Sequence, residues 1–345
     1  MTAVEFDNVS IVFGDRPESA LPAMDAGKDR GEVQTETGQV LGVHNCSLTV
    51  EEGEILVLMG LSGSGKSTLL RAVNGLNPVV RGAVKVNDGN DLVDVTNSDA
   101  ATLRRIRQNH VAMVFQQFGL LPWRSVRENV GLGLELAGMP KAERDGKVDE
   151  QLQLVNLSDW ADRKVGELSG GMQQRVGLAR AFATDAPILL MDEPFSALDP
   201  LIRARLQDEL IELQDKLKRT IIFVSHDLDE AFKLGDRIAI MEGGRIVQCG
   251  TPRDIFTNPV DDYVADFVAH MNPLGVLTAR DVMDAPTEVL PMQVGKFTPV
   301  REILEMMTDT ENRVSVMHEG VLIGDVSRAQ VIAGLLDPRG LSNIG

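Results

Sequence analysis

The sequence has few cysteines, no long apolar run and a shortage of positive charge. Its 345 residues include only Cys46 and Cys249, which predicts free thiols in a reducing compartment and excludes a disulfide framework. No apolar run approaches the ~18 residues that a membrane-spanning helix needs. Residues 1–10 combine neither a basic start nor an apolar stretch, so we expect no signal peptide there.

Acidic residues outnumber basic ones, with 51 Asp and Glu against 34 Lys and Arg and a formal net charge of −17. A chain with this balance is poorly suited to bind nucleic acid or an anionic lipid surface. We therefore expect no nucleic-acid partner. If the chain acts at a membrane, a protein partner should hold it there.

Apolar strand-like runs alternate with amphipathic helical patterns, which predicts an α/β fold with a largely parallel sheet and helices on both faces. The expected strands are 4–13, 54–60, 111–115, 188–191, 221–224 and 238–241, and the expected helices are 67–74, 172–183, 200–217 and 228–234. Residues 14–39 form a polar insert with two short helical patterns, around 18–26 and 30–36. Residues 124–161 hold none of these strands and predict an inserted helical subdomain, placed at about 118–175. A small α+β unit is expected over 277–336.

A glycine-rich loop follows the second of these strands. Residues 60–68 read GLSGSGKST and match the pattern G-x-x-x-x-G-K-[ST]. Glycines let the backbone curl so that its N–H groups point at phosphate oxygens, and the following helix adds its positive end. Lys66 would neutralise the phosphates and the Ser67 hydroxyl would bind Mg²⁺. The predicted ATP-binding residues are Gly60, Leu61, Ser62, Gly63, Ser64, Gly65, Lys66, Ser67 and Thr68.

Two acids and a histidine follow other buried strands. Asp192 ends the run 188–191, which is where a parallel sheet places a Mg²⁺ ligand. Glu193 comes next and would be the base that polarises the attacking water. His226 follows the strand at 221–224, although a single histidine in that position is as readily structural.

Residues 168–175 read LSGGMQQR, and they resemble the LSGGQ signature that distinguishes ABC ATPases from other P-loop proteins. A serine and two glycines at a helix start form an anion site. Met172 departs from the common pattern, which has Gln. We expect little loss, because Ser169 and the glycine backbone should make the contacts. The predicted signature residues are Leu168, Ser169, Gly170, Gly171 and Met172.

The resemblance implies roles for further residues between Val4 and about Ala269. Gln116 looks like the Q-loop glutamine, which contacts Mg²⁺ and water, and His226 looks like the switch histidine at the γ-phosphate. Ser196 and Asp199 belong to a D-loop-like stretch, 196–199. Phe13 is similar to the aromatic that stacks on adenine, although an apolar strand residue also explains it.

In this family two cassettes sandwich two ATP molecules, so the resemblance implies a homodimer. Bacterial importers have a phenylalanine at the position that corresponds to Phe195. This resemblance implies a separate membrane permease and a periplasmic or extracellular substrate-binding protein, with the chain at the cytoplasmic face of the inner membrane. The amino-acid sequences of residues 54–76 and 168–181 resemble those of the glycine betaine/proline/choline importer ATPases, and residues 267–274 (FVAHMNPL) look most like the choline type. An importer for another small solute remains an alternative.

Two alternatives of other classes are disfavoured. ABC ATPases of DNA repair carry long coiled coils and those of the ribosome carry two cassettes, and this chain has neither. A catalytically inactive cassette is disfavoured by the intact Lys66, Asp192, Glu193 and His226.

The end of the chain reads as a separate unit. Residues 298–304 and 321–328 resemble one CBS motif, but Gln330 replaces the acid that would bind a ribose. Residues 250–345 carry 7 basic and 14 acidic residues, a net of −7, which disfavours lipid sensing. We expect an ATPase domain over 1–269, followed by a linker and a single degenerate CBS-like domain over 270–345. That domain is either regulatory or a spacer that aids dimerisation.

Overall fold

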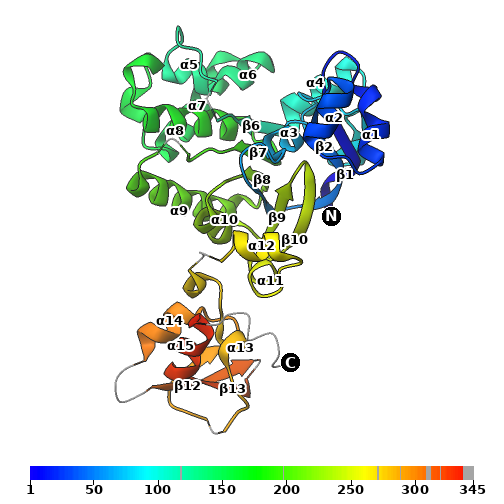
Figure 1. The fold of residues 1–345 in the computed structure, drawn as a ribbon. Helices are drawn as coiled ribbons and strands as arrows, with labels where there is room; N and C mark the ends of the chain where they lie inside the picture. The colour runs from blue at the N-terminus through cyan, green and yellow to red at the C-terminus, as the bar shows by residue number, and fades with distance from the viewer. Residues whose placement is uncertain are drawn as a thin grey trace. The chain divides into compact units, whose positions relative to one another are not determined.

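A computed structural model describes residues 1–116, 119–196, 198–269, 272–287, 289–307, 312–318 and 320–336, apart from the side chains of 213, 215–217 and 275 (Figure 1). The chain divides into two compact units, one of residues 1–226 and 239–246, the other of 227–238 and 247–345. The boundary predicted between 269 and 270 stays a prediction. Phe118, Ala197 and His270, which fall within predicted features, lie outside the described residues.

A six-stranded sheet forms the centre of the ATPase fold, in the order β10-β9-β3-β8-β7-β6. Its middle strands β3, β8, β7 and β6 run parallel, and every residue of β3, β7 and β8 is buried, as continuous apolar runs predict. The predicted parallel sheet is confirmed. The strands are β3 (Ile55–Met59), β6 (Val111–Val114), β7 (Ile188–Asp192), β8 (Thr220–Val224), β9 (Arg237–Glu242) and β10 (Arg245–Gly250).

A second sheet, which the sequence analysis did not predict, is antiparallel in the order β2-β1-β4-β5. Its strands are β1 (Thr2–Phe13), β2 (Val40–Glu51), β4 (Arg81–Asn87) and β5 (Leu92–Asp94). The polar insert connects β1 to β2, which lie side by side. It folds into a 3₁₀ turn and two short helices, close to the two that were predicted: η1 (Pro17–Ala20), α1 (Leu21–Asp25) and α2 (Arg30–Thr37).

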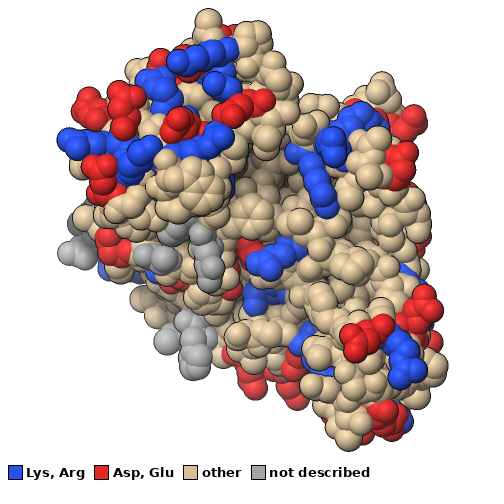
Figure 2. All heavy atoms as spheres, turned by 90° about the horizontal axis from the view of Figure 1, so that it is seen from above, with Lys and Arg blue, Asp and Glu red and all other residues tan. Residues whose placement is uncertain are grey.

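The first unit also holds a helical segment with its own core, in which Val126, Leu152 and Val176 are fully buried. Basic and acidic side chains lie next to one another on the face seen in Figure 2. One ion pair of the helical segment joins Arg124 to Glu135 at 2.7 Å. The helix predicted over 67–74 is shorter, because regular hydrogen bonding ends at Leu70. The helices are α3 (Lys66–Leu70), α4 (Ala100–Asn109), α5 (Val126–Val130), α6 (Leu132–Leu136), α7 (Lys141–Leu154), η2 (Ser158–Trp160), η3 (Val165–Glu167), α8 (Gly170–Ala183) and α9 (Pro200–Leu217).

The second unit contains a three-stranded sheet in the order β11-β12-β13, with β11 and β12 parallel and β12 and β13 antiparallel. Asp325 is buried there and accepts hydrogen bonds from Thr287 and Arg313. Across the described parts of both units, no helix has the length and apolarity to cross a membrane. The elements are α10 (Leu228–Leu234), α11 (Pro252–Thr257), α12 (Asp262–Phe267), η4 (Pro273–Gly275), α13 (Ala279–Val282), β11 (Gln293–Gly295), α14 (Val300–Met306), β12 (Arg313–His318), β13 (Val321–Ser327) and α15 (Arg328–Leu336).

Candidate active site

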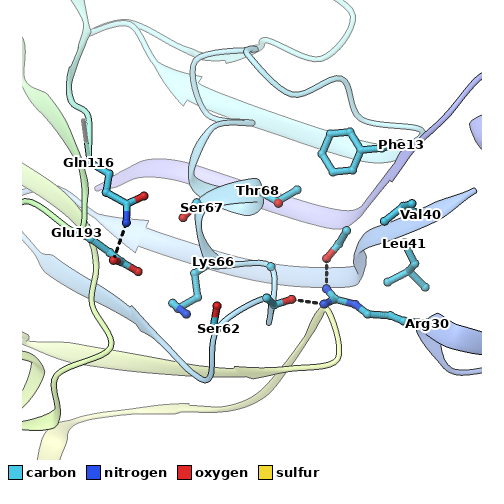
Figure 3. Close-up of a pocket in the computed structure, with 13 residues that line it drawn as sticks. Phe13, Arg30, Val40, Leu41, Ser62, Lys66, Ser67, Thr68, Gln116 and Glu193 are labelled. Carbon is cyan, nitrogen blue, oxygen red and sulfur yellow. Dashed lines mark hydrogen bonds between the residues drawn. The ribbon is translucent and has the colours of Figure 1, made fainter. Parts of the chain in front are cut away.

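The glycine-rich loop links the end of β3 to the start of α3 and borders a pocket of about 490 Å³ (Figure 3). The loop is tightly packed at both ends. A Cβ at Gly60 would lie 2.1 Å from the Met241 carbonyl oxygen, and one at Gly65 would lie 2.6 Å from that of Gly42. Both glycines have positive φ, so only glycine fits either position. The pocket is lined by Phe13, Arg30, Val40, Leu41, Gly42, Ser62, Gly63, Gly65, Lys66, Ser67, Thr68, Gln116 and Glu193.

Lys66 opens α3 and is 5% exposed. Its Nζ donates hydrogen bonds to the carbonyl oxygens of Gly60 at 2.8 Å and Leu61 at 3.0 Å. Burial lowers the pKa of this ammonium, against the raising effect of Glu193 and Asp192. A cation held at the loop by two neutral carbonyls can exchange them for anionic phosphate oxygens, which bind it more strongly.

The two residues predicted to bind Mg²⁺ through a hydroxyl and a carboxylate lie together. The Ser67 hydroxyl donates to Asp192 Oδ1 at 2.6 Å, and the Arg71 guanidinium donates to Asp192 Oδ2 at 2.7 Å. Hard oxygen ligands of this kind suit Mg²⁺, which keeps several waters and binds substrate phosphates as well.

The three predicted catalytic residues lie together, because two of them approach the same carboxylate oxygen of the third. Gln116 Nε2 donates to Glu193 Oε2 at 3.0 Å, and His226 Nδ1 lies 3.4 Å from the same oxygen. Glu193 follows β7 with φ of 47°, a left-handed conformation that a non-glycine residue rarely adopts. Its N–H donates to the Val224 carbonyl at 3.1 Å, which holds the strained backbone in place. Strain of this kind is concentrated at functional sites.

Phe13 ends β1 and forms an apolar wall of the same pocket with Val40 and Leu41 (Figure 3). The ring packs over Gly42, where an added Cβ would lie 2.9 Å from a ring carbon. It is 38% exposed, so one part of the ring is open to a ligand. The position suits the predicted stacking on adenine.

Three of the five predicted signature residues, all except Leu168 and Gly170, border a different pocket, of about 320 Å³, which shares no lining residue with the first. Ser169 caps α8 by accepting a hydrogen bond from the Met172 N–H at 3.4 Å, and Met172 packs against the core of the helical segment. Asp199, predicted in the D-loop, caps α9 and lines this pocket. Ser196 instead donates from its hydroxyl to the Glu193 carbonyl at 3.0 Å. The lining residues are Ser169, Gly171, Met172, Arg175, Leu198, Asp199 and Ile202.

Comparison with known proteins agrees with this geometry. The profile of the family described as ABC transporter matches residues 43–196. The glycine betaine/proline betaine transport system ATP-binding protein ProV of Escherichia coli is 44% identical over 98% of this chain and 84% of its own length. The chain belongs to the ATP-binding proteins of ABC transporters. As a member of this family it binds and hydrolyses ATP.

A choline transport protein and a solved structure match a smaller part of the chain than ProV does. The choline transport ATP-binding protein OpuBA of Bacillus subtilis is 42% identical over 68% of this chain and 60% of its own length. The chain is therefore about as identical to ProV as to this choline protein, and the alignment with ProV covers more of the chain. The cassette MJ0796, solved as a dimer in a post-hydrolysis state with ADP and Pi, is 31% identical with a TM-score of 0.61, over 72% of this chain and 99% of its own.

Sequence reasoning on this ABC ATPase missed two arginines, one that contacts Asp192 and one that lines the pocket. Arg71 lies four residues after Ser67, and this helical spacing places both side chains on one face, so Arg71 could have been found. Arg30 lies in the polar insert and lines the pocket. No local pattern indicates this, because the path of the insert depends on tertiary packing.

Proposed function

We propose that this chain couples hydrolysis of MgATP to the import of a small quaternary amine such as glycine betaine, proline betaine or choline. A separate membrane permease and an external substrate-binding protein would select the solute, with the chain at the cytoplasmic face of the bacterial inner membrane. The proposal that this pocket hydrolyses ATP rests on the contacts of Gln116 and His226 with Glu193 beside the glycine-rich loop. The names of ProV and OpuBA support the solute class.

The pocket residues divide the chemistry among themselves. Lys66 and the loop N–H groups would hold the phosphates, and Phe13 the adenine. Ser67, Gln116 and Asp192 would hold Mg²⁺, which supplies positive charge at the phosphate oxygens. Glu193 would orient the attacking water and accept its proton, while Gln116 and His226 fix that carboxylate and face the γ-phosphate.

We propose a homodimer in which the signature pocket of one chain completes the P-loop pocket of its partner. Each pocket alone lacks half of the expected contacts, since the one with Lys66 and Glu193 includes no signature residue. Leu201, next to the signature pocket, is 79% exposed, as an apolar residue at an interface would be in the single chain. The solved dimer of MJ0796 supports this arrangement.

Residues 270–345 are proposed to be a linker and one degenerate CBS-like domain without a nucleotide site. Gln330 uses its side chain locally, because its amide oxygen accepts the Ser327 N–H. A chain ending after Ala269 should still hydrolyse ATP, since all the predicted catalytic residues precede that point. An ion pair between Arg253 and Asp281 crosses the boundary. Failure of the shortened chain to fold would place the boundary elsewhere.

Uptake by reconstituted transporter tests the proposed function. The chain would be purified with its membrane partner, placed in proteoliposomes and assayed for ATP-dependent uptake of radiolabelled glycine betaine and choline. A Lys66→Ala variant serves as the inactive control. We expect saturable uptake of at least one of the two amines. ATP hydrolysis that drives uptake of neither amine would favour another small solute, and a chain that co-purifies with no membrane protein would favour a role outside transport.

A further inference from the structure

The polar insert, residues 14–39, reaches the nucleotide pocket through a single side chain. Arg30, the first residue of α2, donates hydrogen bonds from Nη1 to the Gly63 carbonyl and from Nη2 to the Gly42 carbonyl (Figure 3). Gly63 lies in the glycine-rich loop and Gly42 in β2. One planar guanidinium therefore joins the insert, the second sheet and the glycine-rich loop.

The surrounding backbone is shaped to admit this guanidinium. A Cβ at Gly244 would lie 3.0 Å from Arg30 Nη2, and one at Gly65 would lie 3.4 Å from the same nitrogen. The two glycines come from the turn after β9 and from the phosphate loop. Gly63 has φ of +79° and an added Cβ there would meet nothing within 4 Å, so the Cβ side of this residue is open. The charge-assisted hydrogen bond from Arg30 to its carbonyl adds to the backbone hydrogen bonds of the loop, such as the one from the Gly244 N–H to the Ser64 carbonyl at 3.1 Å.

The insert is built as a firm platform for this side chain. Its residues Ala20, Met24 and Val33 are buried in a small cluster with β1 and β2. Asp29 caps α2 in a reciprocal arrangement with Glu32, which fixes the turn on which Arg30 stands.

The insert is also tied to the rest of the ATPase fold. Asp25 accepts a hydrogen bond from Arg81 of β4 at 2.8 Å. Gln39 accepts one from the Arg16 N–H at 3.0 Å, which closes the base of the insert. The insert is therefore attached to β4 and closed at its base.

We propose that Arg30 is a positioning residue of the ATP site, which holds the phosphate loop in its binding conformation from the insert. The inference rests on the proposed role of residues 60–68 in phosphate binding. Arg30 contacts one carbonyl of the loop and one of β2, and it makes no contact with Glu193, so it should affect nucleotide affinity and leave the chemical step unchanged. Loss of an interaction present equally in the ground and transition states raises KM without lowering kcat.

Steady-state ATPase kinetics of the full-length chain test this inference. Arg30→Met keeps the apolar stem and removes every donor, and we expect it to raise the KM for ATP about 10-fold with kcat within about twofold. Arg30→Lys keeps the charge but replaces the planar fork of two nitrogens by a single ammonium nitrogen, which fits the two separated carbonyls less well, so we expect a rise of about threefold. Arg16→Met is the matched control, because Arg16 is an exposed arginine of the same insert, and its kinetics should equal those of the wild type.

The outcomes separate this inference from the proposed function. If wild-type chain neither binds nor hydrolyses ATP, the proposed function fails. If wild type is active and folded Arg30→Met keeps its KM within twofold, or loses kcat with KM unchanged, the role of Arg30 is refuted. If Arg30→Met does not fold, Arg30→Lys decides, and a wild-type KM together with a wild-type thermal shift on adding ADP would refute the inference.

Discussion

The two pockets of the ATPase fold differ in what each could do alone. The P-loop pocket gathers a buried lysine, a strained carboxylate and the side chains that orient it. The signature pocket offers the capped start of α8 and contains no lysine, histidine or glutamate among its lining residues. The first has the groups expected for binding and hydrolysing a nucleotide, and the second has groups suited only to holding an anion. The proposed shared site, with one half from each chain, would require this difference.

Removing the base of the P-loop pocket should have the largest effect. Glu193→Gln keeps the size of the side chain and its hydrogen bonds but cannot accept a proton. We expect at least ~10²-fold lower turnover with ATP affinity retained, measured by steady-state hydrolysis and by nucleotide binding. Asp229→Asn, a similar change at an acid that lines neither pocket, is the control. Near-wild-type turnover of Glu193→Gln would contradict the assignment.

Blocking the signature pocket should lower turnover without preventing ATP binding. Ser169→Arg removes the cap of α8 and fills the pocket with a bulky cation, so a partner's nucleotide could not seat there. We expect about 30-fold lower turnover, since an anion contact made on closing is lost, and an ATP affinity within about threefold of wild type. Arg163→Ala, at an exposed site in the same segment, is the control. An equal loss of binding and turnover would mean that the two pockets are one site within a chain.

The smallest effect is expected at Met172. Met172→Gln restores the common family residue but places an amide where a thioether packs against the helical core. We expect turnover within about threefold of wild type and a loss of about 1 kcal/mol in the free energy of unfolding, measured by urea titration. A large loss of turnover would show that this side chain, and not only the backbone, serves the signature pocket.

The sequence was informative where a structure is specified locally. The parallel strands were predicted because buried apolar runs such as 188–191 end in chemically distinctive residues, and the glycine-rich loop was predicted from its own spacing. The second sheet was not predicted, because strands β2 and β4 carry polar residues on their exposed face and pair over long sequence separations. Arg30 was missed for the same reason, since its partners lie 33 and 12 residues away.

Mixed dimers test the shared site most directly. Lys66→Ala and Ser169→Arg chains, each expected to hydrolyse ATP at least about 30-fold more slowly than wild type when alone, would be unfolded together, refolded and assayed. A mixed dimer keeps one intact site, from the Lys66 of one chain and the Ser169 of the other, so an equal mixture should recover up to about a quarter of wild-type activity. A mixture as inactive as its components, with mixed dimers demonstrated, would contradict the account and place the whole active site within one chain.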